Sequence, residues 1–256
     1  MTTWIQYQLN GEKSFGQLSG GWIQPHTGTL FENPQAAGQL VKLAEVEILA
    51  PCQPQKFLGL WNNFYARATA EGWDIPPEPL YFSKVSSSYL AHGQSIVRPQ
   101  NYQGSIFFEA ELGVVIAKSC YQIREDQAEE YIFGYTCVND VTAKEILQRD
   151  PSFPQWTRAK GFNSFGVFGP QIVSGIRSHD LVIQALLDGE VKQQYPVSDM
   201  IFKPEQLVAL LSQYMTLLPG DVIACGTGLG ACAMEHGQTI EVNIDGVGRL
   251  INTMQG

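Results

Sequence analysis

Apolar residues in this chain recur in short runs separated by glycine and proline, a pattern typical of folds built mainly from strands. Residues 1 to about 50 are short alternating pieces, broken at Gly20, Pro25 and Pro34. We therefore predict a small β-rich N-terminal domain over residues 1–50 and a larger domain over residues 51–256.

The larger domain mixes strand-like and helix-like segments without a repeating strand–helix–strand unit. The segment from Gly59 to Gly72 has aromatic residues near helical spacing and predicts a short helix followed by an ordered loop. Strands are predicted at 105–116, up to about 138, and at 169–174, 181–187, 221–225, 239–244 and 248–251, and helices at 125–133, 140–148 and 204–215. This irregular order predicts an α+β fold dominated by strands.

Composition excludes several classes of protein. Charged residues make up 16% of the chain, and 25 acidic against 16 basic residues give a net charge of -9, which disfavours a nucleic-acid partner. The five cysteines include no C-x-x-C pair and indicate neither a disulfide framework nor a zinc knuckle. The sequence has no secretory signal and no apolar stretch of about eighteen residues. We expect a cytoplasmic protein without a membrane partner.

The most informative segment is the predicted strand at 105–116. A side-chain period of two places Glu109 and Glu111 on one face, and both faces are otherwise largely apolar. A strand buried on both sides would leave the two carboxylates repelling each other without water, unless a cation or hydrogen bonds neutralise them. A divalent metal resolves this conflict, whereas an edge strand with both side chains in solvent is the alternative.

A third acid, Asp140, follows about thirty residues downstream. It could instead cap the next helix, where Thr142 and Glu145 form a capping-box pattern. Three carboxylates without a matching histidine or cysteine set suit Mg²⁺, Mn²⁺ or Ca²⁺ better than zinc.

The Glu109-x-Glu111 strand followed by the Asn-Asp-Val-Thr-Ala element at 139–143 resembles the metal-binding pattern of the fumarylacetoacetate hydrolase family. Further similar segments lie at 156–170, 198–202 and 218–228, and the resemblance runs from about Phe57 to the C-terminus. It implies a mixed β-roll catalytic domain with a smaller N-terminal domain, usually in a homodimer. Substrates in the family are small 2-oxo or enol acids chelated to a metal, which undergo C–C hydrolysis, decarboxylation or tautomerisation.

The resemblance also implies roles for individual residues. Metal ligation falls to Glu109, Glu111 and Asp140, and catalytic roles fall to Lys160 and Glu109. Substrate-binding roles fall to Thr227, Gly226, Lys144, Tyr65 and Arg67. The glycine-rich segment 226–230 also permits a dinucleotide-binding interpretation, but a strand-like pair follows it instead of a helix, and too few residues remain for a βαβ unit.

Three departures from the family pattern bear on the reaction. The segment from Gly59 to Glu71, which carries a histidine in hydrolase members, has none here, and Tyr65 or Arg67 takes its place. Neither side chain is a base at neutral pH. Asn163 replaces a usual aspartate, and Gly228 replaces a usual proline.

These departures favour chemistry that needs a Lewis acid but no activated water. We expect a metal-dependent enzyme that tautomerises (isomerises) or decarboxylates a small 2-oxo or enol dicarboxylic acid through a metal-stabilised enolate. This is closest to the 2-hydroxyhepta-2,4-diene-1,7-dioate isomerase and decarboxylase members. The alternatives are a C–C hydrolase of fumarylacetoacetate or acylpyruvate type and a catalytically weakened homologue that binds a 2-oxo acid.

Overall fold

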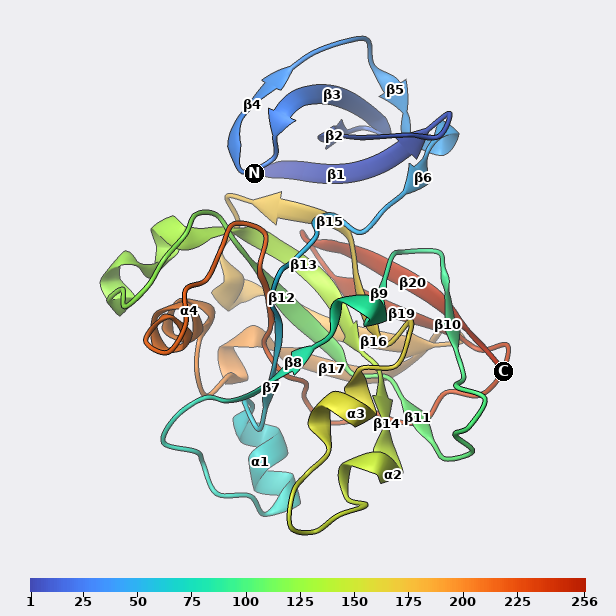
Figure 1. The fold of residues 1–256 in the computed structure, drawn as a ribbon, viewed down its shortest axis with the longest axis vertical. Helices are drawn as coiled ribbons and strands as arrows, with labels where there is room; N and C mark the ends of the chain where they lie inside the picture. The colour runs from blue at the N-terminus through green and yellow to red at the C-terminus, as the bar shows by residue number, and fades with distance from the viewer.

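The computed structural model describes residues 1–256, and strands dominate it, as the sequence predicts (Figure 1). None of its helices combines the length and the apolar character needed to cross a lipid bilayer. The α-helices are α1 (Tyr65–Glu71), α2 (Lys144–Leu147), α3 (Trp156–Lys160) and α4 (Pro204–Ser212). Short 3-10 helices are η1 (Leu43–Glu45), η2 (Ser86–Ser88), η3 (Glu125–Tyr131), η4 (Ser178–Asp180) and η5 (Val197–Asp199).

The N-terminal fifty residues form a small antiparallel unit at one end of the molecule, blue in Figure 1. Its strands are β1 (Thr2–Leu9), β2 (Glu12–Ser19), β3 (Trp22–Thr29), β4 (Glu32–Ala36), β5 (Val41–Lys42) and β6 (Glu47–Ile48). Ile5, Tyr7 and Ile23 form a small core of its own. β1 also pairs with β15 (Gly166–Ser174), so the unit extends the main sheet.

The main sheet runs in the order β4-β3-β2-β1-β15-β13-β12-β18-β7-β8. Its remaining strands are β7 (Phe57–Trp61), β8 (Leu80–Lys84), β9 (Tyr89–Leu90), β12 (Ala110–Ile116), β13 (Ile132–Asp140) and β18 (Val222–Ala224). The neighbours from β15 to β18 are antiparallel, β18 and β7 are parallel, and β7 and β8 are antiparallel. Some strands that are far apart in the sequence, such as β12 and β18, are thus neighbours in this sheet.

A second sheet packs on the first in the order β10-β20-β19-β16-β17. Its strands are β10 (Ser95–Val97), β16 (Val182–Leu187), β17 (Glu190–Pro196), β19 (Thr239–Ile244) and β20 (Gly248–Gln255). A separate short pair joins β11 (Ile106–Phe107) to β14 (Thr142–Ala143). The largest core cluster lies between the two sheets and contains residues of β12, β13, β16, β19 and β20.

Strand β12 has the alternation that the sequence predicts. Leu112, Val114 and Ile116 join the core between the sheets, whereas Val115 joins a second core with residues of β15 and β18. Every residue of β12 is buried. The alternative of an edge strand with Glu109 and Glu111 in solvent is thus excluded.

Several predicted elements differ from those observed. The strand predicted at 105–116 is interrupted at Phe108 and Glu109, between β11 and β12. The helix predicted at 125–133 is the 3-10 helix η3, after which β13 begins at Ile132. The helix predicted at 140–148 is only α2, because β13 continues through Asp140 and the next residues pair with β11. The helix predicted at 204–215 ends at Ser212.

The predicted capping box is also absent. Thr142 and Glu145 make tertiary contacts instead of bonding each other's backbone: the Thr142 hydroxyl meets Lys160, and the Glu145 carboxylate accepts hydrogen bonds from Tyr102 and the Ser105 N–H. The helix predicted within Gly59 to Gly72 is α1, which begins only at Tyr65 because β7 extends to Trp61. The sequence does not predict strands β7, β8, β9, β10, β14 and β17. Strand pairing between distant segments thus determines the elements around Asp140, and a local sequence pattern does not reveal such pairing.

The second core cluster provides a stability test of this packing. Phe168 on β15 is fully buried, with ring centroids 5.3 Å from Phe57 and 5.8 Å from Tyr89. We expect Phe168→Ala to lower the free energy of unfolding by about 3–5 kcal/mol, measured by urea denaturation, because it leaves a cavity. The exposed Phe153 is the matched control. Phe153→Ala should change the free energy of unfolding by less than about 0.5 kcal/mol. Equal effects of the two substitutions would contradict this packing.

Candidate active site

Three buried carboxylates meet where β12 begins and β13 ends. Because Glu111 lies opposite Val138 and Ala110 opposite Asn139, the antiparallel register brings Glu109 and Glu111 beside Asp140. The Asp140 N–H donates to the Glu109 carbonyl at 2.9 Å, and the Glu109 N–H donates to the Asn139 side-chain oxygen at 3.1 Å. One oxygen of each carboxylate lies within 4.8 Å of the others. The three predicted metal ligands are thus adjacent in the fold.

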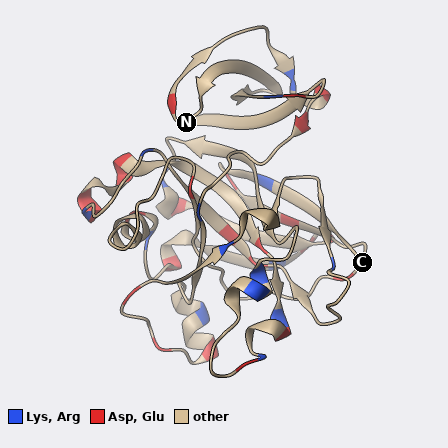
Figure 2. Cartoon of the chain, viewed as in Figure 1, with Lys and Arg blue, Asp and Glu red and all other residues tan.

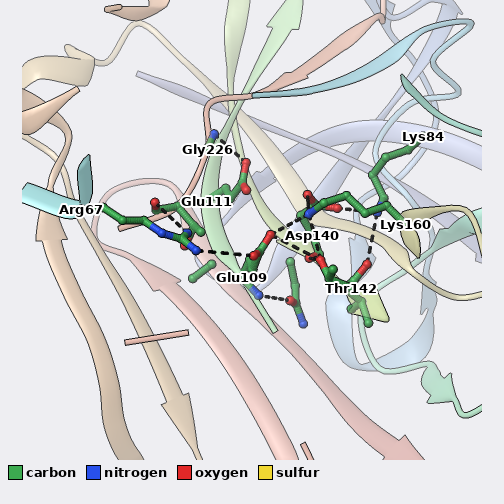
Figure 3. Close-up of polar contacts among 12 residues, drawn as sticks. Arg67, Lys84, Glu109, Glu111, Asp140, Thr142, Lys160 and Gly226 are labelled. Atoms are coloured by element: carbon green, nitrogen blue, oxygen red, sulfur yellow. Dashed lines mark hydrogen bonds and ion pairs between the residues drawn. The ribbon is translucent and has the colours of Figure 1, made fainter. Parts of the chain in front are cut away.

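Two buried lysines hold Asp140. Lys160 from α3 donates to one of its oxygens and Lys84 from β8 donates to the other (Figure 3). Although burial opposes ionisation, Lys160 and Lys84 together keep the pKa of Asp140 below its usual value. Asp140 is therefore a carboxylate held ionised by two cations, and not a helix cap.

Lys160 is the centre of this network. Its ammonium lies 2.6 Å from Glu109 Oε2 and 2.8 Å from the Thr142 hydroxyl, besides its bond to Asp140. Burial lowers the pKa of Lys160, but Asp140, Glu109 and Glu111 outweigh burial and raise it above the usual value. Lys160 is thus a buried, charged residue and not the surface lysine that this residue type most often is.

Glu111 has no cation of its own. Its Oε2 accepts a hydrogen bond from the Gly226 N–H at 2.7 Å, and its carboxylate forms no salt bridge. Burial, and then the charges of Asp140 and Glu109, raise the pKa of Glu111 well above its usual range. A carboxylate in this position stays ionised only if a further positive charge lies beside it.

The donor chemistry of this cluster fits a divalent cation. All three side chains offer hard carboxylate oxygens, which Mg²⁺, Mn²⁺ and Ca²⁺ prefer. The two buried lysines pair with Asp140 and Glu109, and Glu111 is the member without a cation partner. Glu109, Glu111 and Asp140 are the residues that would hold the ion.

Arg67 from α1 approaches the cluster from the side opposite Lys160 (Figure 3). Its Nη2 lies 4.0 Å from Glu109 Oε1, and its Nη1 donates to the Thr227 carbonyl at 3.2 Å. Glu109 is thus flanked by two cations that come from different parts of the chain. Helices α1, α2 and α3 lie together at the lower end of the molecule, and each carries Lys or Arg residues (Figures 1 and 2).

A pocket of about 820 Å³ opens above the cluster. Its lining includes Glu109, Lys160, Arg67, Lys144 and Thr227. A cavity of this size that joins apolar walls to a few charged groups has the character of a small-molecule site.

The other predicted substrate-binding residues differ in position. The Lys144 ammonium lies 5.4 Å from the Phe107 ring centroid, at the pocket wall. The Gly226 N–H is directed at Glu111 and does not point into the pocket as a free donor. Tyr65 is 47% exposed and does not line the pocket. Of the two residues considered for the histidine position, only Arg67 reaches the acidic cluster.

Several residues of the site were not found from the sequence. Lys84 is one, because the sequence predicts an ordered loop where β8 lies. The signal that could find it is its spacing of two from Phe82, which puts both side chains on the buried face. Gln193 and Tyr195 from β17 are others. They hold the Thr227 hydroxyl at 2.9 and 3.2 Å.

The structure gives physical reasons for the departures at two positions. A Cβ at Gly228 would lie 2.6 Å from the Tyr195 ring, so glycine fits the tyrosine that supports Thr227. Asn163 is exposed and does not contact Lys160, which Asp140, Glu109 and Thr142 orient instead. None of the four histidines lines the pocket.

Comparisons with known sequences and structures show which proteins this chain is similar to. Residues 56–255 match the family model described as fumarylacetoacetate (FAA) hydrolase C-terminal, and residues 3–51 match the model described as Rv2993c-like, N-terminal. A 4-hydroxyphenylacetate degradation bifunctional isomerase/decarboxylase from Salmonella dublin is 36% identical over 198 residues, which cover 76% of this chain and 45% of that protein.

Two solved structures are informative. A 2-hydroxyhepta-2,4-diene-1,7-dioate isomerase from Mycobacterium marinum has a TM-score of 0.91 and 31% identity, over 100% of this chain and 98% of that chain. A fumarylpyruvate hydrolase from Pseudomonas aeruginosa, solved with Mn²⁺ and pyruvate, has a TM-score of 0.73 and 28% identity, over 80% and 91% of the two chains. With the family model covering most of its length, this chain belongs to the fumarylacetoacetate hydrolase family.

Proposed function

We propose that this protein is a divalent-metal-dependent enzyme that tautomerises or decarboxylates a small 2-oxo or enol dicarboxylic acid. The observation that carries the proposal is a buried carboxylate, Glu111, without a cation, in a cluster whose Glu109 and Lys160 line a pocket. The isomerase and isomerase/decarboxylase relatives support the same reaction class. A divalent cation held by the cluster would act as a Lewis acid toward a 2-oxo group.

The chain's own residues divide the remaining work. Arg67 is the cation available to bind a substrate carboxylate, because it enters the pocket from the side opposite Lys160. The Lys160 ammonium donates its three N–H groups to Glu109, Asp140 and Thr142, so it would act on the substrate as a fixed positive charge beside an oxygen on which negative charge develops. Glu109 also lines the pocket, and its Oε1 is the carboxylate oxygen not bonded to Lys160, which makes it the group placed to accept a proton from the substrate.

C–C hydrolysis is the less favoured reaction for this pocket. Such a reaction needs a general base that activates water, and a base must reach that water directly or through one hydrogen bond. The pocket has no histidine, and the residue of α1 nearest to Glu109 is an arginine. Tautomerisation and decarboxylation need charge stabilisation but no activated water.

The proposed function is tested by ketonisation of 2-hydroxyhepta-2,4-diene-1,7-dioate or enol-oxaloacetate, followed at a fixed ultraviolet wavelength. We expect turnover with Mg²⁺ and only the uncatalysed rate with EDTA. Glu111→Gln should abolish both turnover and Mg²⁺ binding by calorimetry, because it removes the carboxylate without a partner. Glu130→Gln is the matched control, since that side chain is 74% exposed, and it should change neither.

Absence of metal-dependent turnover on every 2-oxo acid tested would refute the enzyme and leave a ligand-binding homologue. Wild-type turnover in Glu111→Gln would remove that residue from the site.

Lys84 tests the charge balance of the cluster. We expect Lys84→Met to lower the free energy of unfolding by about 3–5 kcal/mol without metal, because it leaves Asp140 buried with one cation fewer. Mg²⁺ should then raise the melting temperature of the variant more than that of the wild type. Lys118→Met, at an exposed lysine paired with Glu130, is the control. Equal destabilisation by both substitutions would show that Lys84 does not balance the cluster.

Arg67 tests how the substrate is held. We expect Arg67→Gln to raise KM for the 2-oxo acid about tenfold or more, because it removes a charge-assisted contact. Arg158→Gln on the exposed side of α3 should leave KM unchanged. An unchanged KM in Arg67→Gln would exclude carboxylate binding by this residue, and rapid cleavage of an acylpyruvate by the wild type would show that the pocket has a base other than histidine.

A further inference from the structure

Four aromatic side chains form a continuous wall in the pocket above the acidic cluster. They are Trp61 at the end of β7, Trp73 after α1, Phe82 on β8 and Trp156 at the start of α3. We call this set the aromatic wall. Its members come from segments up to 95 residues apart, and all four line the same cavity.

The rings of the aromatic wall contact each other in sequence. The Trp73 and Trp61 centroids are 4.9 Å apart, those of Trp61 and Trp156 are 6.0 Å apart, and Trp156 stacks on Phe82 at 5.2 Å with an interplanar angle of 9°. Such distances and angles are those of favourable aromatic pairs, so the rings hold each other in place. The wall is therefore a preformed surface.

Both ends of the aromatic wall meet a cation that touches Glu109. The Arg67 guanidinium lies 5.6 Å from the Trp73 ring centroid, and the Lys160 ammonium lies 4.8 Å from the Phe82 ring centroid. The same two cations flank Glu109 (Figure 3). A ligand whose acid group binds Arg67 thus has the aromatic wall beside the remainder of its carbon skeleton.

The pocket is larger and has more apolar lining than a small diacid needs. Its volume of about 820 Å³ lies near the upper end of the roughly 300–1,000 Å³ typical of sites for drug-sized ligands. Leu60, Leu147, Pro79, Pro151 and Pro154 continue the apolar lining beyond the wall. The three tryptophans are only partly buried, so their rings are not consumed by packing within the protein.

We infer that the substrate is a 2-oxo or enol dicarboxylic acid that also bears a planar apolar group of about the size of a benzene ring, and that this group packs against Trp61 and its neighbours in the aromatic wall. The inference rests on the proposed function for the position of the acid group and adds the class of substituent. A planar ring matches the faces of the wall, whereas a charged or strongly hydrated tail would lose its water there without gaining hydrogen bonds.

The test compares two stable ligands that differ only by a phenyl group on C4, 2-oxobutanoate and 2-oxo-4-phenylbutanoate. Binding to the full-length protein with Mg²⁺ is measured by calorimetry. We expect the phenyl compound to bind about tenfold to a hundredfold more tightly, because its ring leaves water for the aromatic wall.

Substitutions in the aromatic wall test where the phenyl group of the ligand binds. Trp61→Ala should remove the preference for the phenyl compound while leaving the affinity for 2-oxobutanoate within about twofold, and Trp61→Phe should retain most of the preference. Trp73→Ala probes the same wall from another segment, so the test stands if one variant does not fold. Trp22→Ala is the matched control, because that tryptophan is 43% exposed on the N-terminal unit outside the pocket.

Each outcome decides between the two proposals. Equal affinity for the two ligands would overturn the aryl-bearing substrate and leave the proposed function intact. Tighter binding of the phenyl compound that survives both Trp61→Ala and Trp73→Ala would also overturn it, since the ring would then lie elsewhere. Failure of both ligands to bind with Mg²⁺ would refute the 2-oxo acid site itself, and this inference with it.

Discussion

Mutual compensation of buried charges is the interaction on which the rest of this structure depends. Three carboxylates taken out of water at the junction of β12 and β13 would repel each other and lose their hydration. Lys84 and Lys160 offset most of that cost, but each comes from a different part of the chain. Strand β8 and helix α3 therefore have to close over the end of β13 before the cluster is stable, which couples catalytic geometry to folding.

The same compensation determines what the pocket can do. Each oxygen of Asp140 accepts from one ammonium group, whereas Glu109 shares one oxygen with Lys160 and presents the other toward Arg67. Glu111 is held only by a backbone N–H. Three carboxylates that look alike in the sequence thus have three different environments, and environment assigns different roles to identical groups.

The sequence was sufficient for the parts of the site that depend on a local pattern. A strand apolar on both faces has no solvent side, so the burial of Glu109 and Glu111 follows from their neighbours. Lys84 could not be found in this way, because its burial depends on Asp140, 56 residues away, and on the pairing of β8 with β7. For the same reason the helix expected from Asp140 onward is mostly absent: β14 pairs with β11, and that tertiary contact outweighs a local capping pattern.

The pairing of β1 with β15 has a consequence for the molecule as a whole. Thr2 to Trp4 bond along Ile172 to Ser174, at a place where β15 has β13 on its other side. Without the first fifty residues, this stretch of the catalytic sheet would expose a row of unpaired N–H and C=O groups next to buried Ile172 and Val173. Such an open edge is a template for strands of other molecules. The N-terminal unit thus covers an edge of the main sheet that would otherwise be open to pairing with a strand of another chain.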